Sequence, residues 1–192
     1  MSAGAAETEA VAQVRGYFGI GVEGISKPMN LGNLVRSAHA FGAGFAFTIG
    51  ADPRSFGAKS DTSASPDSMP VYRYDRVDDL ELPEGCTLVG VELLDSAIEL
   101  PSFRHPRRAA YVLGPERGQL SDALRARCRF VVRIPTRFCI NLATAGAVLM
   151  YDRMLSLGKF AERPVTPHGG SVPHPNHVFG APRQRTRDSG AP

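Results

Sequence analysis

The chain has 192 residues, 43% of them hydrophobic and 21% charged, which is typical of a globular protein with one domain-sized core. No apolar run approaches the roughly 18 residues that a membrane-spanning helix needs, and three cysteines without CxxC spacing argue against a disulfide framework or a zinc site. The formal net charge of +3 permits an anionic partner without demanding one. Since the small, acidic N-terminus lacks the pattern of a signal peptide, we expect a cytoplasmic protein that binds neither membrane nor metal.

The first half of the chain is predicted to alternate strand and helix. Residues 15–22 and 45–49 are predicted strands, because they are short apolar runs bounded by turn residues. Between them, Asn30 is expected to cap a helix whose apolar residues recur at helical spacing. A long loop rich in Ser, Asp, Pro and Gly is predicted over 50–70, followed by a short strand at 70–74.

The second half continues the alternation. Near-continuous apolar runs predict buried strands at 87–93, 109–114 and 130–135. Helices are predicted over 121–128, capped by Ser121, and over 141–157. Strands that alternate with helices in this way predict an α/β fold, with a mostly parallel sheet and helices on both faces.

The ends of the chain differ in composition from its centre. Residues 1–14 are short and rich in alanine, which predicts a disordered arm. Residues 161–192 are rich in Pro and Gly and have almost no large apolar groups, which predicts a disordered tail. This tail holds three of the five histidines, but without a rigid frame they predict no metal site. The folded domain is therefore expected to span 15–160.

The first of three candidate motifs is NLGNLVRSAHAFG, at 30–42. Spacing of three residues places Asn30, Asn33 and Arg36 on one polar face of the helix, opposite its apolar face. Taken alone, this pattern is also typical of any capped amphipathic helix with an exposed arginine.

The second motif is YVLGPERGQLSD, at 111–122. A buried strand runs into a glycine turn that carries Glu116, and ligands of open α/β sheets bind in the crevice beyond such strand ends. The alternative is a simple connection from strand to helix.

The third motif is RIPTRFCINLATAGAVLMYD, at 133–152. A strand ends at Pro135, a short loop follows, and Asn141 opens a helix whose first turns are small residues. Small residues allow close approach of a ligand or another backbone. A tightly packed core helix would show the same pattern.

Together and in this order, the motifs resemble the SpoU (TrmH-like) family of the SPOUT superfamily of RNA 2′-O-ribose methyltransferases. That family shows an N-x-G-x-x-x-R helix, a strand ending in G-P-E-x-x-G, and I-P followed by a short loop, S-L-N and a small-residue helix. The resemblance spans roughly residues 15–158. The matching residues are Asn30, Gly32 and Arg36; Gly114, Pro115, Glu116 and Gly118; and Ile134, Pro135 and Asn141.

The resemblance implies a fold, a cofactor and a reaction. The fold would contain a C-terminal trefoil knot, and the protein would be a homodimer. The cofactor would be S-adenosylmethionine, and the reaction would be methyl transfer to a ribose 2′-hydroxyl of RNA. Transfer RNA is favoured over ribosomal RNA, because the chain lacks the N-terminal RNA-binding extension of many relatives. By motif position, the cofactor would be held by Val91, Gly114, Ile134, Cys139, Ile140 and Asn141.

The resemblance also assigns catalytic roles to Arg36, Asn30, Glu116 and Asn141. Since arginine in proteins is not deprotonated, we expect Arg36 to clamp a phosphate and stabilise the developing alkoxide. The other three would orient the sugar, Arg36 or the cofactor. Two departures affect the third motif: Cys139 replaces the family serine, and the loop before Asn141 is shorter than usual.

Two other functions remain open at this stage. Gly19, Gly21 and Gly24 spell the G-x-G-x-x-G of a dinucleotide-binding oxidoreductase, although that fingerprint requires a helix that opens at the third glycine. A non-catalytic RNA-binding protein of the same fold is the second alternative.

The helix predicted over residues 142–157 is apolar on nearly all sides. A surface helix needs only one apolar stripe. The excess predicts a homodimer joined partly through this helix, and complete burial within one subunit is the alternative.

Overall fold

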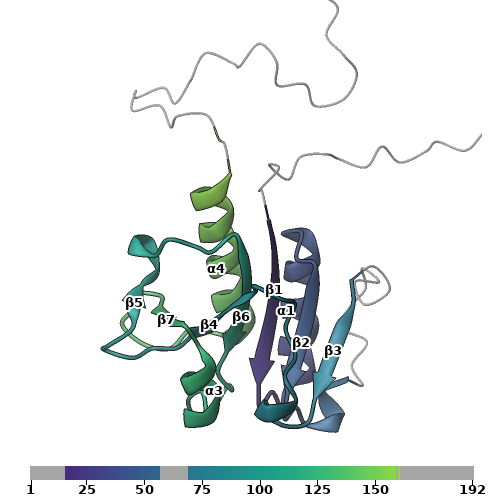
Figure 1. The fold of residues 1–192 in the computed structure, drawn as a ribbon. Helices are drawn as coiled ribbons and strands as arrows, with labels where there is room; N and C mark the ends of the chain where they lie inside the picture. Colours follow the sequence, from purple (N-terminus) through teal and green to yellow (C-terminus); the bar gives the residue numbers. More distant parts are fainter. Residues whose placement is uncertain (1–15, 57–68, 159, 161–192) are drawn as a thin grey trace, which may run out of the picture. The chain divides into compact units, whose positions relative to one another are not determined.

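The computed structural model describes residues 16–56, 69–158 and 160 (Figure 1). The predicted arm at 1–14, the predicted tail at 161–192 and most of the loop predicted over 50–70 lie outside the described residues. The chain divides into two units, 1–159 and 160–192, and every element named below belongs to the first.

A parallel sheet is the centre of this unit. Its seven strands lie in the order β3-β2-β1-β6-β4-β7-β5, and each of their six pairings is parallel. The α/β fold with a mostly parallel sheet is therefore confirmed. The strands are β1 (Tyr17–Glu23), β2 (Phe45–Ile49), β3 (Val71–Tyr74), β4 (Thr87–Val91), β5 (Ile98–Glu99), β6 (Arg108–Leu113) and β7 (Phe130–Arg133).

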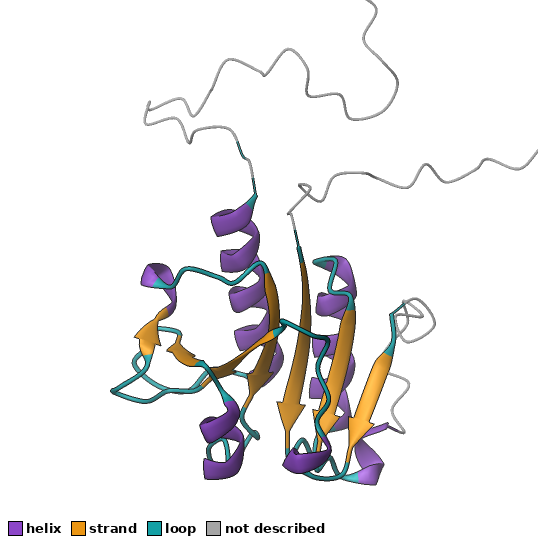
Figure 2. Ribbon diagram, viewed as in Figure 1, coloured by secondary structure: helices purple, strands orange, loops and turns teal. Residues whose placement is uncertain are grey.

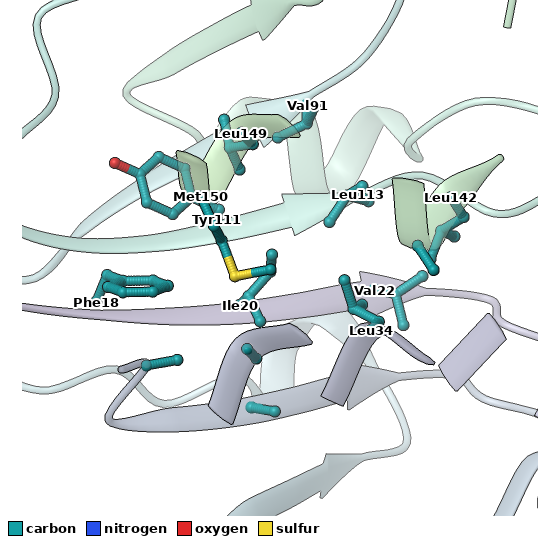
Figure 3. Packing of buried hydrophobic residues seen from close by; sticks show 14 of the residues in the cluster. Phe18, Ile20, Val22, Leu34, Val91, Tyr111, Leu113, Leu142, Leu149 and Met150 are labelled. Carbon is teal, nitrogen blue, oxygen red and sulfur yellow. The ribbon is translucent and has the colours of Figure 1, made fainter. Parts of the chain in front are cut away.

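Helices cover both faces of the sheet, as predicted (Figure 2). Along β6, Tyr111 faces a core shared with α1 and α4, whereas Val112 faces a second core that contains Leu124 of α3. This alternation follows from the period of two in a strand. Figure 3 shows the first core, where Leu149 and Met150 pack over the sheet. The helices are α1 (Pro28–Ala40), α3 (Asp122–Arg127) and α4 (Leu142–Leu157), with 3-10 turns η1 (Pro53–Phe56), η2 (Val77–Asp79) and η3 (Leu100–Ser102).

The start of α1 differs from the prediction. The helix begins at Pro28 with Lys27 as its N-cap, so assigning Asn30 as the cap was wrong. Proline is well tolerated at the first helical position, because its missing N–H would have no partner there. Asn30 consequently lies in the first turn, where it is buried.

The cap predicted for α3 is confirmed, and α4 begins one residue after its predicted start, with Asn141 as its N-cap. The Ser121 hydroxyl accepts a hydrogen bond from the backbone N–H of Leu124 at 3.2 Å. The side chain of Asn141 accepts from the backbone N–H groups of Ala143 and Thr144, at 2.9 and 3.2 Å. Asn141 is thereby fixed at the start of α4, with its amide nitrogen left to donate elsewhere.

Two glycines of the dinucleotide pattern lie inside β1. A Cβ atom on Gly19 would approach the Phe45 ring to 2.2 Å, and one on Gly21 would approach the Phe47 ring to 2.4 Å. These glycines therefore make room for aromatic rings of β2. The third, Gly24, has a φ of 62° and is followed by a loop rather than a helix. The geometry excludes the phosphate-binding fingerprint.

A buried polar network, formed by His105, Tyr111, Asp152 and Arg153, fastens α4 to the sheet. Nε2 of His105 lies 2.9 Å from Asp152 Oδ2, and Nδ1 lies 2.6 Å from Tyr111 Oη. A carboxylate only accepts, so Nε2–H donates to Asp152 and Nδ1 accepts from the tyrosine hydroxyl. Burial raises the pKa of Tyr111 to about 12, which keeps that donor protonated. Tyr111 Oη in turn accepts from Arg153 at 3.1 Å.

We expect His105 to make the fold sensitive to acid. Burial lowers the pKa of His105, and the hydrogen bond from Nε2–H to Asp152 offsets this only partly. The unfolded chain therefore takes up a proton near pH ~6.5 while the folded chain does not. The contribution of His105 to the free energy of unfolding should therefore be fully present above pH ~6.5. It should be lost as the pH falls from there towards the lower pKa of His105 in the folded state.

Urea unfolding at pH 7.5 and pH 5.5 measures this effect. The variant His105→Gln should be less stable at pH 7.5 but should lose less on acidification. If acidification lowered the free energy of unfolding equally in the wild-type protein and in His105→Gln, His105 would not be the acid-sensitive group.

Candidate functional site

A cavity of about 360 Å³ opens beyond the carboxyl ends of β4, β6 and β7. This is the edge at which open α/β sheets bind ligands. Apolar side chains at strand ends, including Val91 and Leu113, form part of its wall. The first turns of α1 and α4 close it, through Asn30 and Leu142.

The six residues predicted to hold a cofactor all line this one cavity. They come from three segments that are far apart in the sequence, namely the end of β4, the turn after β6 and the loop between β7 and α4. Because β4 pairs with both β6 and β7, the three segments meet at one edge of the sheet. The six are Val91, Gly114, Ile134, Cys139, Ile140 and Asn141.

Three of the four predicted catalytic residues are joined by hydrogen bonds. The Asn141 side-chain amide donates to Asn30 Oδ1 at 3.0 Å. The Asn30 side-chain amide donates to Glu116 Oε1 at 3.1 Å. This relay of Asn141, Asn30 and Glu116 connects the start of α4, the start of α1 and the turn after β6, so it fixes the walls of the cavity relative to one another.

Glu116 accepts further bonds from the N-terminus of α1. Its carboxylate accepts from the backbone N–H of Ser26 and of Lys27, each at 3.2 Å, and from the Ser26 hydroxyl at 3.3 Å. Burial alone would raise the pKa of Glu116, but the bonds from Asn30, Ser26 and Lys27 outweigh it and lower the pKa. Glu116 is therefore an ionised anchor at a helix N-terminus rather than a proton donor.

Arg36 lies apart from this relay. It is exposed on α1, six residues or about 9 Å of helix beyond Asn30, and does not line the cavity. Asn33, on the same predicted polar face, is also exposed. The structure therefore brings Asn30, Glu116 and Asn141 together but leaves Arg36 free to meet a ligand larger than the cavity.

Sequence reasoning missed Glu92, which also lines the cavity. Its Oε1 accepts from the backbone N–H of Leu93 at 3.0 Å, and its Oε2 accepts from that of Leu120 at 2.9 Å. A Cβ atom on Gly114 would lie 2.7 Å from Oε2, so the glycine lets the carboxylate reach across the turn. The available signal was an acidic residue placed directly after the buried run TLVGV.

Two other features are absent from the described part of the chain. Within it, no three His, Cys, Asp or Glu side chains are grouped so that they could hold a metal ion. None of its helices is long and apolar enough to cross a lipid bilayer.

Comparison with known families gives one match. A model of the SpoU rRNA methylase family matches residues 18–151, which include all three motifs except the last residue of the third. Comparison with curated proteins gives no match.

Solved structures share the fold. The SpoU methyltransferase AviRb from Streptomyces viridochromogenes is 25% identical with a TM-score of 0.63, over 75% of this chain and 61% of that enzyme. An rRNA methyltransferase from Sinorhizobium meliloti is 22% identical with a TM-score of 0.67, over 79% and 60%. Both have also been solved with AdoMet bound. This chain thus spans about three fifths of the length of these two enzymes.

A third structure is matched over nearly its whole length. It comes from work on 2-OH methylation of C/U34 on tRNA, and it is 22% identical with a TM-score of 0.62. The match covers 74% of this chain and 97% of that protein.

Proposed function

The chain belongs to the SpoU rRNA methylase family, and from that membership we propose that it transfers a methyl group from S-adenosylmethionine to a ribose 2′-hydroxyl of RNA. The observation that carries this proposal is the cavity, because the six expected cofactor residues line it and the relay of Asn141, Asn30 and Glu116 borders it. Neither feature was required by the family match alone.

The cavity fits the cofactor in size and in chemistry. Its volume lies in the range of about 300–1,000 Å³ that is usual for small-molecule sites. Val91, Ile134 and Ile140 offer apolar surface for an adenine, and the Glu92 and Glu116 carboxylates favour a cationic ligand. When bound, the cofactor supplies a methyl group already activated by the sulfonium charge.

The chain's own residues would then act by positioning and electrostatics. The relay residues keep the cavity walls in place, and the four donors on Glu116 leave it no proton to give. The guanidinium of Arg36 is a cation, so it would bind a phosphate next to the acceptor ribose and stabilise the oxyanion that forms as the hydroxyl loses its proton to solvent water. The cofactor would leave as the neutral thioether.

Transfer RNA is the proposed substrate. The neighbour from the tRNA study is matched over nearly its whole length, whereas the AviRb and S. meliloti enzymes contain long parts that this chain does not match. Ribosomal RNA is the second candidate, favoured by the family's description. A non-catalytic RNA-binding role is the third, because Cys139 stands in the cavity where the family has serine.

We further propose a cytoplasmic homodimer whose C-terminal segment forms the trefoil knot of the family. The outward side of α4 supports the dimer, because Val148 and Tyr151 are 39% and 47% exposed. Complete burial of the helix within one subunit is thereby excluded. Sedimentation at micromolar concentration tests the dimer, and a monomer there would refute it.

Calorimetry and methyl transfer together test the function. The purified chain should bind S-adenosylmethionine, and total RNA from a strain lacking the gene should accept labelled methyl groups at one ribose position. Binding without transfer to any RNA would favour the non-catalytic role. Failure to bind the cofactor would overturn the proposal.

We expect Glu92 to be needed for cofactor affinity. In Glu92→Ala, Leu120 loses its hydrogen-bond acceptor and the turn that carries Gly114 loosens, so the Kd for S-adenosylmethionine should rise by about tenfold, the effect of roughly 1.4 kcal/mol. Glu92→Gln keeps one acceptor oxygen, so its Kd for S-adenosylmethionine should lie between those of the wild-type protein and Glu92→Ala. Glu84→Ala, at an exposed position before the amino end of β4 and outside the cavity lining, is the control. An unchanged Kd in Glu92→Ala would refute the role.

A further inference from the structure

We propose that the rim of the cavity is an RNA-binding surface in which Phe138 stacks on a nucleobase while Lys27, Arg117 and Arg137 bind flanking phosphates. These four residues are called the rim below. The inference rests on the proposed function and specifies how the substrate is held.

Phe138 is unusually exposed. At 74% it is the most exposed large hydrophobic side chain in the described ranges 16–56, 69–158 and 160. It lies in the loop between β7 and α4, directly before Cys139 and two residues after Thr136, which both line the cavity. Burial of a phenylalanine stabilises a fold by about 1.5–3 kcal/mol, so a ring presented at a cavity mouth points to a partner.

The cations of the rim are unpaired within the described part of the chain. Lys27 lines the cavity, Arg117 lies between the lining residues Glu116 and Gly118, and Arg137 follows the lining residue Thr136. No salt bridge joins any of the three to a described acidic residue, and all three are exposed. Elsewhere on the surface, arginines do bind carboxylates, namely Arg54, Arg76, Arg125 and Arg133.

An aromatic ring among unpaired cations matches a nucleotide strand. Bases stack on aromatic side chains with little sequence preference, and phosphates attract arginine and lysine. A ribose that enters the cavity must bring its base out of the neighbouring stack. At the mouth of the cavity, the Phe138 ring gives that base, or the neighbouring base, a surface on which to stack in place of the lost base neighbour.

The test compares rim variants in methyl transfer to the transfer-RNA fraction of a strain lacking the gene. Phe138→Ala should raise the KM for RNA by about tenfold, which is within the measured range for loss of one stacked base, with the Kd for S-adenosylmethionine unchanged. Phe138→Trp should restore the KM. Arg117→Gln and Arg137→Gln should each reduce the dependence of KM on salt. The matched controls are Tyr72→Ala, an exposed aromatic on β3, and Arg104→Gln, an exposed arginine preceding β6.

The outcomes separate this inference from the proposed function. Suppose that the wild-type protein methylates RNA, but Phe138→Ala has the wild-type KM for RNA or Tyr72→Ala raises this KM equally. The rim is then not the RNA-binding surface, and the proposed function stands. A raised Kd for S-adenosylmethionine in Phe138→Ala would place the ring in the cofactor site. If this variant sedimented as a monomer and the wild-type protein as a dimer, the ring would be a subunit contact. Either result overturns the inference. If the wild-type protein methylates no RNA, both proposals fail.

Discussion

Replacing Arg36 by alanine should lower kcat/KM for RNA methylation by about 100-fold, the usual cost of removing one donor to a developing oxyanion. The free energy of unfolding should hardly change. Arg36 is exposed on α1 and lies outside the cavity, so its loss leaves no hole in either core. The Kd for S-adenosylmethionine should also stay the same, because the cavity is intact. Urea unfolding, calorimetry and single-turnover methyl transfer measure the three quantities.

Two further variants show whether methylation depends on the Arg36 guanidinium itself or on any change to this face of α1. Asn33→Ala changes the same exposed face of α1 without touching a cation, and it should keep nearly full activity. Arg36→Lys keeps the charge but loses the planar fork that binds a phosphate with two bonds, so it should recover only part of the rate. If Arg36→Ala retained more than about a tenth of the wild-type kcat/KM, a loss below ~1.4 kcal/mol, the catalytic assignment would be wrong.

The cavity could be located from the sequence because its walls begin where buried strands end. The apolar runs before Gly114 and Ile134 marked two strands, and the carboxyl ends of parallel strands share one edge of a sheet. Which strands are neighbours could not be deduced in the same way. β6 lies between β1 and β4, so the pairing that brings Val91 beside Leu113, the residue before Gly114, depends on long-range packing.

Other parts of the site had no local signal. Glu116 was identified as a candidate, but its contact with the backbone of Ser26 and Lys27 joins residues 89 or 90 positions apart. The beginning of α1 was misplaced because asparagine is a favoured cap and Asn30 was assigned that position, although Pro28 also suits a first helical turn. The two-residue strand β5 is exposed and has no alternating pattern to predict it.

The largest effect on stability is expected from Arg153, which the sequence pattern gave no reason to bury. Arg153 is 2% exposed, and its guanidinium donates to the backbone oxygens of Pro106 at 2.6 Å and Arg107 at 2.9 Å, and more distantly to that of Tyr17 at 3.3 Å. It also lies 5.2 Å from the centre of the Phe18 ring. A charged side chain is ordinarily placed on the surface, yet Arg153 joins α4 to the beginnings of β1 and β6.

Arg153→Met should therefore lower the free energy of unfolding by about 3–5 kcal/mol, because it removes the donor while the carbonyl oxygens and Tyr111 remain buried. Arg129→Met, at an exposed arginine, should cost less than about 0.5 kcal/mol. Below the melting temperature, Arg153→Met should still bind S-adenosylmethionine with the wild-type Kd, since Arg153 is some 18 Å along α4 from the cap at Asn141. Urea unfolding with calorimetry on the same samples separates the two effects. An Arg153→Met variant as stable as the wild-type protein would show that the hydrogen bonds of this guanidinium contribute little to the free energy of unfolding. If such a stable variant had also lost cofactor binding, Arg153 would belong to the functional site.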